Sequence, residues 1–327
     1  MTGSPITRKP AVSGRTTAPV ALCLFLALCA ASLSVGVADL SLEEQGASLD
    51  TVLISRLPRT LAAVLVGAGL AIAGLIMQTL ARNRFVDPGI GGTEQSAALG
   101  VLLATVLWPA APILGKMMVA TLTALIGTAV FLLLVRRLPP TQPYLMPLFG
   151  LIYGGVITAG VTFIAWQMDF LQYLDIWMNG DFSGILRGRY EILWATAALV
   201  ALAWWLADAL TIVTLGKDAS IGLGLDYERM MRIGLFIVAV LSALTVVVVG
   251  MIPFVGLIVP NLVSRLRGDN LRGTLPWVAL GGAALTVGCD LIGRLLRYPF
   301  EIPIGTILGV VGAACFLWFL TGRHARG

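Results

Sequence analysis

Ten separate apolar stretches, most of them near the length of a lipid bilayer, constrain this chain more than any other feature. A transmembrane helix needs about 20 mainly apolar residues. The eighth stretch is short and contains two prolines, so its separation from the seventh is the least distinct. We therefore expect an all-α polytopic membrane protein with about ten transmembrane helices. The stretches are residues 18–38, 60–80, 94–109, 113–135, 144–166, 190–206, 230–249, 253–265, 274–296 and 303–320.

The overall composition excludes several classes of protein. Of the 327 residues, 58% are hydrophobic and only 12% are charged, whereas about a quarter of the residues of a soluble domain are charged. The mean hydropathy is +0.92. A soluble domain cannot cover this much apolar surface, because its outside must be polar. An ordinary soluble enzyme, a disordered chain and a nucleic-acid binder are excluded, and the expected surroundings are a lipid bilayer.

The basic residues predict the orientation in the membrane. With the N-terminus inside, most Lys and Arg residues fall on the inner side, as the positive-inside rule requires for cytoplasmic loops. We expect a cytoplasmic tail at 1–17, a single transmembrane domain at 18–320 and a second cytoplasmic tail at 321–327. The stretches 39–59 and 167–189 are expected outside, and the stretch 207–229 is expected inside.

Groups that could carry catalysis or bind a metal are scarce. The only histidine is His324, and the four cysteines lie inside apolar stretches without a CxxC pair, so neither a zinc site nor a redox motif is predicted. No Walker A phosphate loop is visible. We expect no cofactor and no enzymatic activity, and any ATP-driven step requires a separate ATPase. Ionisable groups inside the bilayer are functional candidates, and Asp290 and Arg294 have the spacing of an i,i+4 ion pair.

Glycine is abundant, at 37 residues, and many glycines lie inside the apolar stretches. Small residues let the backbones of membrane helices approach closely. Runs such as Gly67–Gly69 and Gly281–Gly282 therefore predict a tightly packed helix bundle.

Three longer motifs carry a resemblance to a known family. The first motif runs from Arg56-Leu-Pro-Arg59 through Gln78 to Arg82-Asn-Arg-Phe-Val-Asp-Pro-Gly89. The second is Gly250-Met-Ile-Pro-Phe-Val-Gly-Leu-Ile-Val-Pro-Asn261, continuing to Asn270, and the third joins Asp290-Leu-Ile-Gly-Arg294 to Glu301-Ile-Pro-Ile-Gly305. Together they resemble the FecCD family, the membrane permeases of ABC importers for iron–siderophore, haem and vitamin B12.

The resemblance implies a ten-helix bundle like that of the vitamin B12 permease, in the bacterial cytoplasmic membrane. It also implies two cytoplasmic ATP-binding subunits, a second permease subunit that is either identical or a paralogue, and a periplasmic or lipid-anchored binding protein. The residues in these motifs are most similar to those of permeases for catecholate-type siderophores. A haem or vitamin B12 permease of the same family remains an alternative, as does an ion-coupled secondary transporter.

The family's docking positions correspond to Arg56, Arg59 and Arg294, which fall on the outer side. In the family, arginines there meet glutamates of the binding protein, and a planar guanidinium suits such pairs. The alternative is that Arg56 and Arg59 anchor a helix end at the lipid headgroups, while Asp290 satisfies Arg294.

Two inner segments also match positions that act in the family. A coupling segment of two short helices, which contacts the ATPase, corresponds to Gly216, Lys217, Asp218, Ala219, Gly222, Leu223 and Gly224. We expect Gly222 and Gly224 to supply the break between the helices. A cytoplasmic gate corresponds to Asn83 and Phe85, together with the loop at 139–143. The alternatives are a plain polar loop and an ordinary tight turn at Asp87-Pro88-Gly89.

Overall fold

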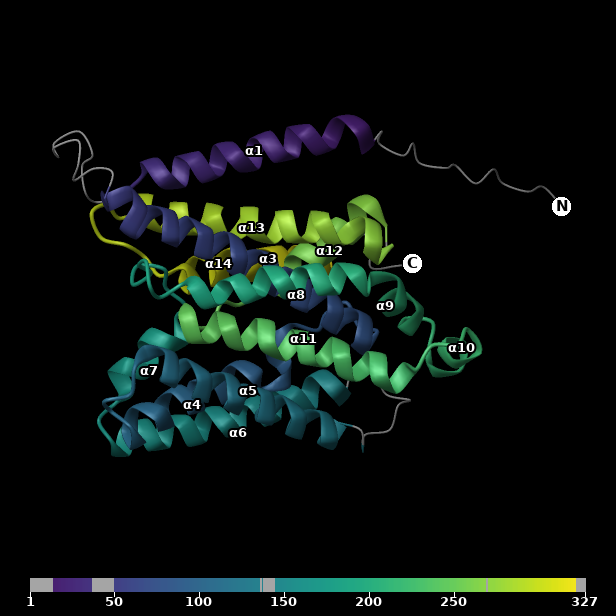
Figure 1. The fold of residues 1–327 in the computed structure, drawn as a ribbon, viewed down its shortest axis with the longest axis horizontal. Coiled ribbons are helices and arrows are strands. Elements are labelled where there is room, and N and C mark those ends of the chain that lie inside the picture. Colours follow the sequence, from purple (N-terminus) through teal and green to yellow (C-terminus); the bar gives the residue numbers. More distant parts are fainter. Residues whose placement is uncertain (1–13, 37–49, 136, 138–144, 269, 322–327) are drawn as a thin grey trace.

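The computed structural model describes all residues except 1–13, 37–49, 136, 138–144, 269 and 322–327. The described residues form helices joined by turns and loops, with no strand among them (Figure 1). The helices are α1 (Gly14–Ser34), the π-helical turn η1 (Val52–Arg56), α3 (Leu57–Ala81), the short 3-10 helix η2 (Pro88–Gly91), α4 (Thr93–Leu107), α5 (Ile113–Val135), α6 (Leu145–Gln167), α7 (Leu171–Met178), the short 3-10 helix η3 (Glu191–Leu193), α8 (Trp194–Trp205), α9 (Ala207–Val213), α10 (Lys217–Gly222), α11 (Tyr227–Val248), α12 (Val255–Arg267), α13 (Leu271–Leu295) and α14 (Ile304–Thr321).

Each of the ten predicted apolar stretches corresponds to one of these helices, which confirms the all-α membrane bundle. Within the described residues, five helices are long and apolar enough to cross a bilayer unaided: the continuous helix Val52–Ala81, then α5, α6, α11 and α13. The pair Glu191–Trp205 and Ala207–Val213 makes a sixth span, bent by 62°. Helix α1 begins at Gly14, so it includes residues 14–17 of the predicted N-terminal tail.

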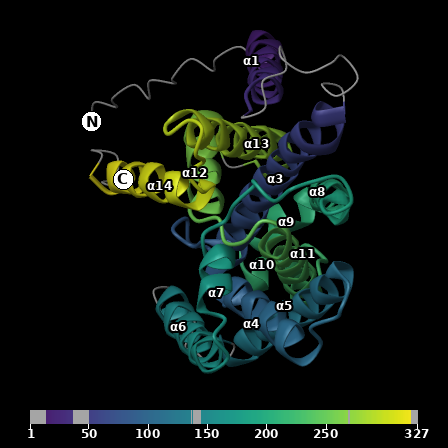
Figure 2. The same cartoon turned by 90° about the vertical axis from the view of Figure 1, so that its left-hand side faces the viewer.

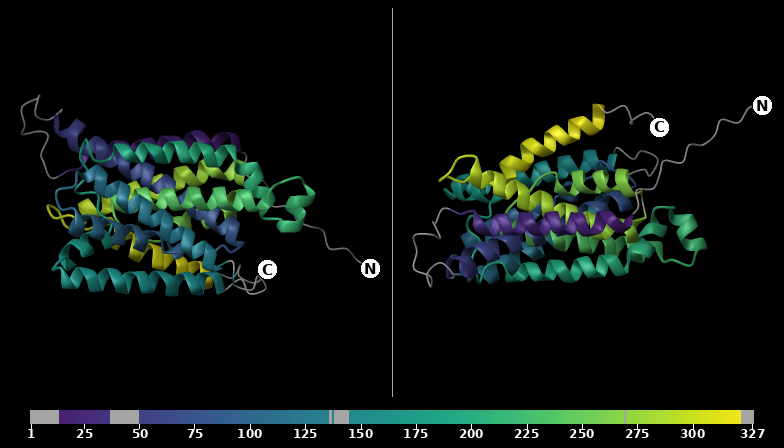
Figure 3. Two further views of the ribbon diagram at one scale, coloured as in Figure 1. Left: turned by 60° about the horizontal axis from the view of Figure 1, so that its bottom comes forward. Right: turned by 90° about the horizontal axis from the view of Figure 1, so that it is seen from above.

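Two ends of the bundle are distinguished below. The outer end is the one that the charge pattern assigns to the outside, and it holds Arg59, α7 and the beginning of α14. The inner end lies opposite and holds α10, which projects beyond the other helices on the right of Figure 1. Helix α1 runs along the edge of the bundle (Figures 2 and 3).

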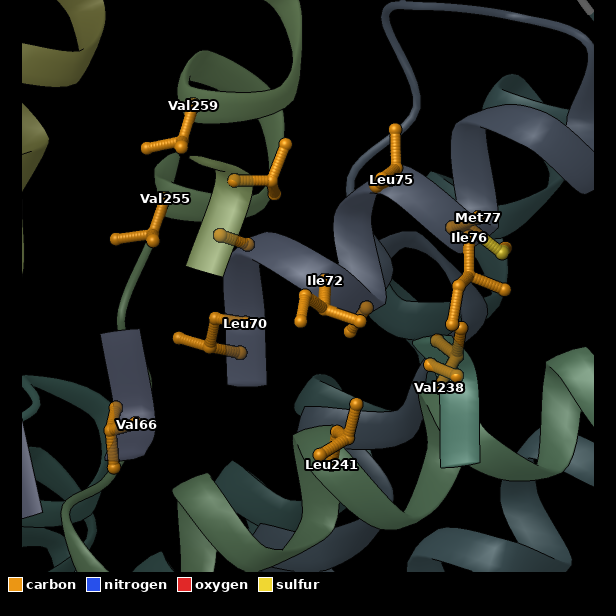
Figure 4. Close-up of a cluster of buried hydrophobic side chains, with 14 of the residues drawn as sticks. Val66, Leu70, Ile72, Leu75, Ile76, Met77, Val238, Leu241, Val255 and Val259 are labelled. Carbon is orange, nitrogen blue, oxygen red and sulfur yellow. The ribbon is translucent and has the colours of Figure 1, made fainter. Parts of the chain in front are cut away.

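Helix α3 forms the centre of the molecule and packs against α8, α11, α12 and α13. Its buried side chains meet those of α11 and α12 in one apolar core, of which Figure 4 shows a part. Leu70, Ile72 and Ile76 of α3 and Leu241 of α11 are each at most 2% exposed. A helix that is apolar on nearly all sides is typical of the interior of a bundle.

Glycines set the distance between α3 and two of its neighbours. A Cβ atom on Gly67 would lie 2.4 Å from the carbonyl oxygen of Gly282, and one on Gly74 would lie 1.9 Å from that of Gly256. Both distances are shorter than any side chain tolerates. The backbones of α13 and α12 therefore touch α3 directly, which confirms the close packing predicted from Gly67 and Gly282.

The eighth predicted span differs from a simple transmembrane helix. Helix α12 has only 13 residues, or about 20 Å at 1.5 Å per residue, which is shorter than the hydrocarbon core of a bilayer. The preceding residues are non-helical but buried, with Val249 5% and Ile252 3% exposed. The carbonyl oxygen of Val249 accepts a hydrogen bond from the N–H of Asp181, at 2.8 Å. Non-helical backbone of this kind is tolerated where protein surrounds it.

The expected inner loop 207–229 is partly a helix. Its first seven residues form α9, whose side chains Ala207, Leu210 and Val213 are fully buried. Helix α9 packs against α3, α11 and α13. Only the segment from Thr214 onward projects from the bundle.

Candidate docking, gating and coupling sites

Three arginines surround a hollow of about 270 Å³ at the outer end, called the outer hollow below. Arg56 lies in the π-helical turn η1, Arg59 in the first turn of α3, and Arg294 in the last turn of α13. Glu301, in the connection between α13 and α14, lines the same hollow. The structure thus brings together all three predicted docking residues, and it adds one acid.

Arg59 lies between two carboxylates. Its Nε and Nη2 atoms donate to Asp290, with 2.7 Å between Nη2 and Oδ1. Its Nη1 atom donates to both oxygens of Glu301, at 3.0 and 2.8 Å. The Asp290 side chain is 3% exposed, whereas that of Glu301 is 22% exposed. Arg59 therefore joins a buried acid to an acid at the rim.

Arg294 and Arg56 hold the end of the first helix. Nη1 of Arg294 donates to the carbonyl oxygens of Ser32 and Val35, and Nη2 contacts both the Ser32 hydroxyl and Asp290. Nη1 of Arg56 donates to the carbonyl oxygens of Leu33 and Ser34. The last carbonyls of a helix have no partner within the helix, so the two guanidinium groups supply what α1 lacks.

The outer arginines are buried within the chain. Arg56 and Arg294 are each 5% exposed, and the predicted i,i+4 pair is present, with 2.7 Å between Arg294 Nη2 and Asp290 Oδ2. The sequence motif contains Glu301 but does not indicate its contact with Arg59. The bonds of Arg59 to Asp290 and Glu301 join residues more than 230 positions apart, and helical spacing cannot reveal such contacts.

The predicted gate residues lie in the turn that follows α3. Arg82 ends the helix with a left-handed backbone, at φ 49°. The Asn83 side-chain oxygen then accepts a hydrogen bond from the N–H of Phe85, at 2.9 Å. The Phe85 ring is 49% exposed and meets the edge of Phe316 from α14, at 6.1 Å between ring centroids. The structure therefore brings Asn83 and Phe85 together beside the inner part of α14, while the loop at 139–143 lies outside the described residues.

The turn at Asp87-Pro88-Gly89 is also present. The Asp87 carboxylate accepts a hydrogen bond from the N–H of Gly89, at 3.0 Å. Burial raises the pKa of this carboxyl to about 6, and the hydrogen bond from Gly89 opposes that rise. The tight turn and the predicted gate are thus neighbouring parts of one connection.

An inner hollow of about 290 Å³ opens beside this turn, between α3, α12 and α13. On its α12 side, the Asn261 amide donates to the carbonyl oxygens of Arg84 and Leu257, both at 2.7 Å. The turn after α3 is therefore fastened to α12. The lining residues are Leu75, Gln78, Thr79, Arg82, Asn83, Arg84, Thr214, Pro260, Asn261, Ser264, Gly268, Leu271, Thr274 and Val278.

The predicted coupling residues form α10 and the turns on either side of it. Gly216 precedes the helix with φ 109°, and Gly224 follows it with φ 79°, values that favour glycine. Gly222 is the last residue of α10 and has no positive φ. Gly224 thus separates α10 from the long helix α11 and not from a second short helix, and the other glycine with a positive φ is Gly216 in place of Gly222.

The projecting segment presents apolar side chains to its surroundings. Leu215, Ile221 and Leu223 are 62%, 56% and 62% exposed. Lys217, Asp218 and Ala219 are exposed on α10, and Lys217 forms an exposed ion pair with Glu228 at 3.3 Å. Ser220, in contrast, is fully buried and donates to the carbonyl oxygen of Gly216 at 2.6 Å. A short helix fixed at its base and apolar at its tip is suited to contact another protein.

The end of α3 and the predicted coupling segment meet at Arg82. A Cβ atom on Gly216 would lie 2.9 Å from Nη2 of Arg82, so this guanidinium packs directly on the Gly216 backbone. The end of α3 and the beginning of α10 are therefore in contact.

Comparison with known proteins decides the family. The model of the FecCD transport family matches residues 19–322. The chain belongs to the FecCD transport family. This confirms the resemblance seen in the motifs, and it establishes an integral membrane protein of the transport permease type.

Named relatives of this FecCD protein include siderophore permeases. It is 41% identical over 308 residues to the petrobactin import system permease protein YclN of Bacillus subtilis, covering 92% of this chain and 97% of the relative. It is 39% identical to the ferric-anguibactin transport system permease protein FatD of Vibrio anguillarum, covering 90% and 96%. A solved structure described as an inward-facing conformation of a metal-chelate type ABC transporter aligns with a TM-score of 0.80 at 26% identity, over 92% of this chain and 98% of that one.

Proposed function

We propose that this chain is the membrane-spanning permease subunit of an ATP-driven importer that carries an iron–siderophore complex across the bacterial cytoplasmic membrane. The observation that carries the proposal is the 41% identity with a petrobactin import permease over nearly the whole of both chains. The same family includes the vitamin B12 import permease BtuC of Vibrio cholerae, which is 33% identical to this chain. A haem or vitamin B12 chelate is therefore the alternative cargo.

In this proposal both chain termini lie in the cytoplasm, and ATP is hydrolysed by two separate subunits. The ATPase contacts α10 and the residues beside it, where the apolar side chains of Ile221 and Leu223 are 56% and 62% exposed. Contact with an ATPase would cover them. Because Arg82 packs on Gly216, movement of α10 would reach the end of α3 directly.

At the opposite end, the outer hollow receives an acidic surface of a binding protein that delivers the chelate. Arg56, Arg59 and Arg294 line this hollow, and the guanidinium of Arg59 already binds carboxylates, so a carboxylate of the partner suits it. A second permease subunit completes the pathway. Asn83 and Phe85 close its inner end, next to α14.

The deciding experiment is transport in proteoliposomes that contain the permease, its ATPase and its binding protein. We expect ATP-dependent uptake of radiolabelled iron as its petrobactin complex, and none when the ATPase is left out. Uptake that follows an imposed proton or sodium gradient without ATP would replace the proposal with a secondary carrier. Preferential uptake of haem or vitamin B12 would change the cargo and keep the mechanism.

A further inference from the structure

Glu301, the acid at the rim of the outer hollow, differs from Asp290 in its contacts and its exposure. Glu301 is held by Arg59 through the Nη1 atom, at 2.8 and 3.0 Å. Asp290, in contrast, bonds to both Arg59 and Arg294 and is 3% exposed. Glu301 is thus paired with Arg59 and is the more exposed of the two acids, so it is the easier to replace.

The other two arginines of the outer hollow make contacts that hold helices together. Arg294 bonds to Asp290 and to the end of α1, and Arg56 bonds to the carbonyl oxygens of Leu33 and Ser34. Moving either guanidinium would leave the carbonyl oxygens at the end of α1 buried without a hydrogen-bond donor, which costs free energy. An incoming group therefore meets a single exchangeable contact, the one between Arg59 and Glu301.

The contact that Glu301 makes with Arg59 indicates what that group is. Nη1 of Arg59 already binds Glu301 in the two-oxygen manner that suits a carboxylate. The matching ligand is thus another carboxylate, presented by an acidic protein surface on the outside.

Glu301 also lies three residues before Ile304, the first residue of α14. The backbone next to it is fixed by two hydrogen bonds, from the N–H of Ile302 to the carbonyl oxygen of Gly293 and from the N–H of Gly305 to that of Gly180, both at 3.1 Å. At its inner part, the same helix carries Phe316, which contacts the predicted gate residue Phe85. One helix therefore joins the outer hollow to the gate.

We propose that Glu301 is a built-in occupant of a carboxylate site on Arg59, and that an acidic side chain of the docking partner replaces it and thereby loosens the beginning of α14. This inference rests on the proposed docking role of the outer hollow and adds to it. In this proposal Arg56 and Arg294 hold α1. Displacement of Glu301 couples docking at the outer end to the beginning of α14.

The test uses the full chain in lipid nanodiscs, with a hexaglutamate peptide as the probe and hexaglutamine as the uncharged control. We expect E301Q to bind hexaglutamate about tenfold more tightly than the unmodified chain, because the internal competitor has lost its charge. The matched control is E191Q, which removes an exposed acid near the beginning of α8, within the same stretch of chain as the outer loop. It should change affinity less than twofold, since it raises the net charge equally without opening the site.

Hydrogen exchange at the Ile302 and Gly305 amides gives the second measurement. Bound hexaglutamate should speed their exchange several-fold in the unmodified chain, and E301Q should exchange as fast without peptide. Equal affinities of E301Q and E191Q, no binding to E301Q, or unchanged exchange with bound peptide would each overturn the proposal. The assay contains no ATPase, binding protein or chelate, so its failure is distinct from a failure of transport.

Discussion

The side-chain amide of Gln78 donates a hydrogen bond to the carbonyl oxygen of Gly256, with 3.1 Å between Nε2 and O. Pro260 lies four residues after Gly256 in α12 and has no N–H, so it removes the hydrogen bond that an α-helix gives to this carbonyl. Gln78 is 8% exposed. A buried side chain of α3 therefore supplies the donor that the α12 carbonyl lacks because of Pro260. This contact lies where Gly74 and Gly256 bring the two backbones together.

Replacing Gln78 with leucine should destabilise the protein by about 1–3 kcal/mol, because the Gly256 carbonyl is left buried without a donor. Thermal unfolding in nanodiscs measures the loss. Adding Pro260→Ala should reduce the loss, since residue 260 then supplies its own N–H. Gln167→Leu, at an exposed position, serves as the control. Equal losses for Gln78→Leu with and without Pro260→Ala would contradict this account.

Replacing Asp290 with asparagine should destabilise the protein strongly, by about 3–5 kcal/mol, because two buried guanidinium groups lose their shared carboxylate. The matched control is Asp208→Asn, which breaks an ion pair with Arg272 in which both side chains are more than half exposed. Exposed pairs contribute at most about 1 kcal/mol. Thermal unfolding of both variants in nanodiscs compares them, and similar losses would mean that the Asp290 cluster is not structurally important.

The apolar helices and their order could be predicted because a long apolar stretch has few alternatives in a membrane. The form of the eighth span could not. The length rule describes a helix that crosses unaided, whereas α12 relies on a buried non-helical segment, including Val249 and Ile252, that the surrounding protein protects. The bend before α9 is likewise not predictable from apolar length, and the helix that follows it packs against α3 and α13.

The candidate sites show the same limit. Helical spacing was sufficient to predict the pair of Asp290 and Arg294, but the bridge from Arg59 to Glu301 depends on the tertiary fold. In the coupling segment, the sequence shows where glycines are and not which of them adopts a positive φ. Gly216 and Gly224 do, while Gly222 is helical.

Replacing Gly224 with valine should impair coupling, because a β-branched residue is strained at φ 79° and the turn after α10 must change. We expect at least a several-fold loss of transport-linked ATPase stimulation in the reconstituted complex, with binding-protein docking unchanged. Gly222→Ala is the control, since a Cβ atom there meets nothing within 4 Å. Normal stimulation in Gly224→Val would remove this turn from the mechanism.

The orientation of the bundle gives the last prediction, for which two glycines make a matched pair. Gly184 at the outer end and Gly222 at the inner end are both exposed, and a Cβ atom on either meets nothing within 4 Å. Each is replaced by cysteine in a chain whose four native cysteines have been changed to alanine. The excess of Lys and Arg on the inner side predicts that α10 faces the cytoplasm. A membrane-impermeant maleimide should therefore label Gly184→Cys in intact cells, and Gly222→Cys only after the membrane is permeabilised. The reverse pattern would invert the bundle and place the outer hollow in the cytoplasm, and labelling of both variants in intact cells would mean that the chain inserts in two orientations.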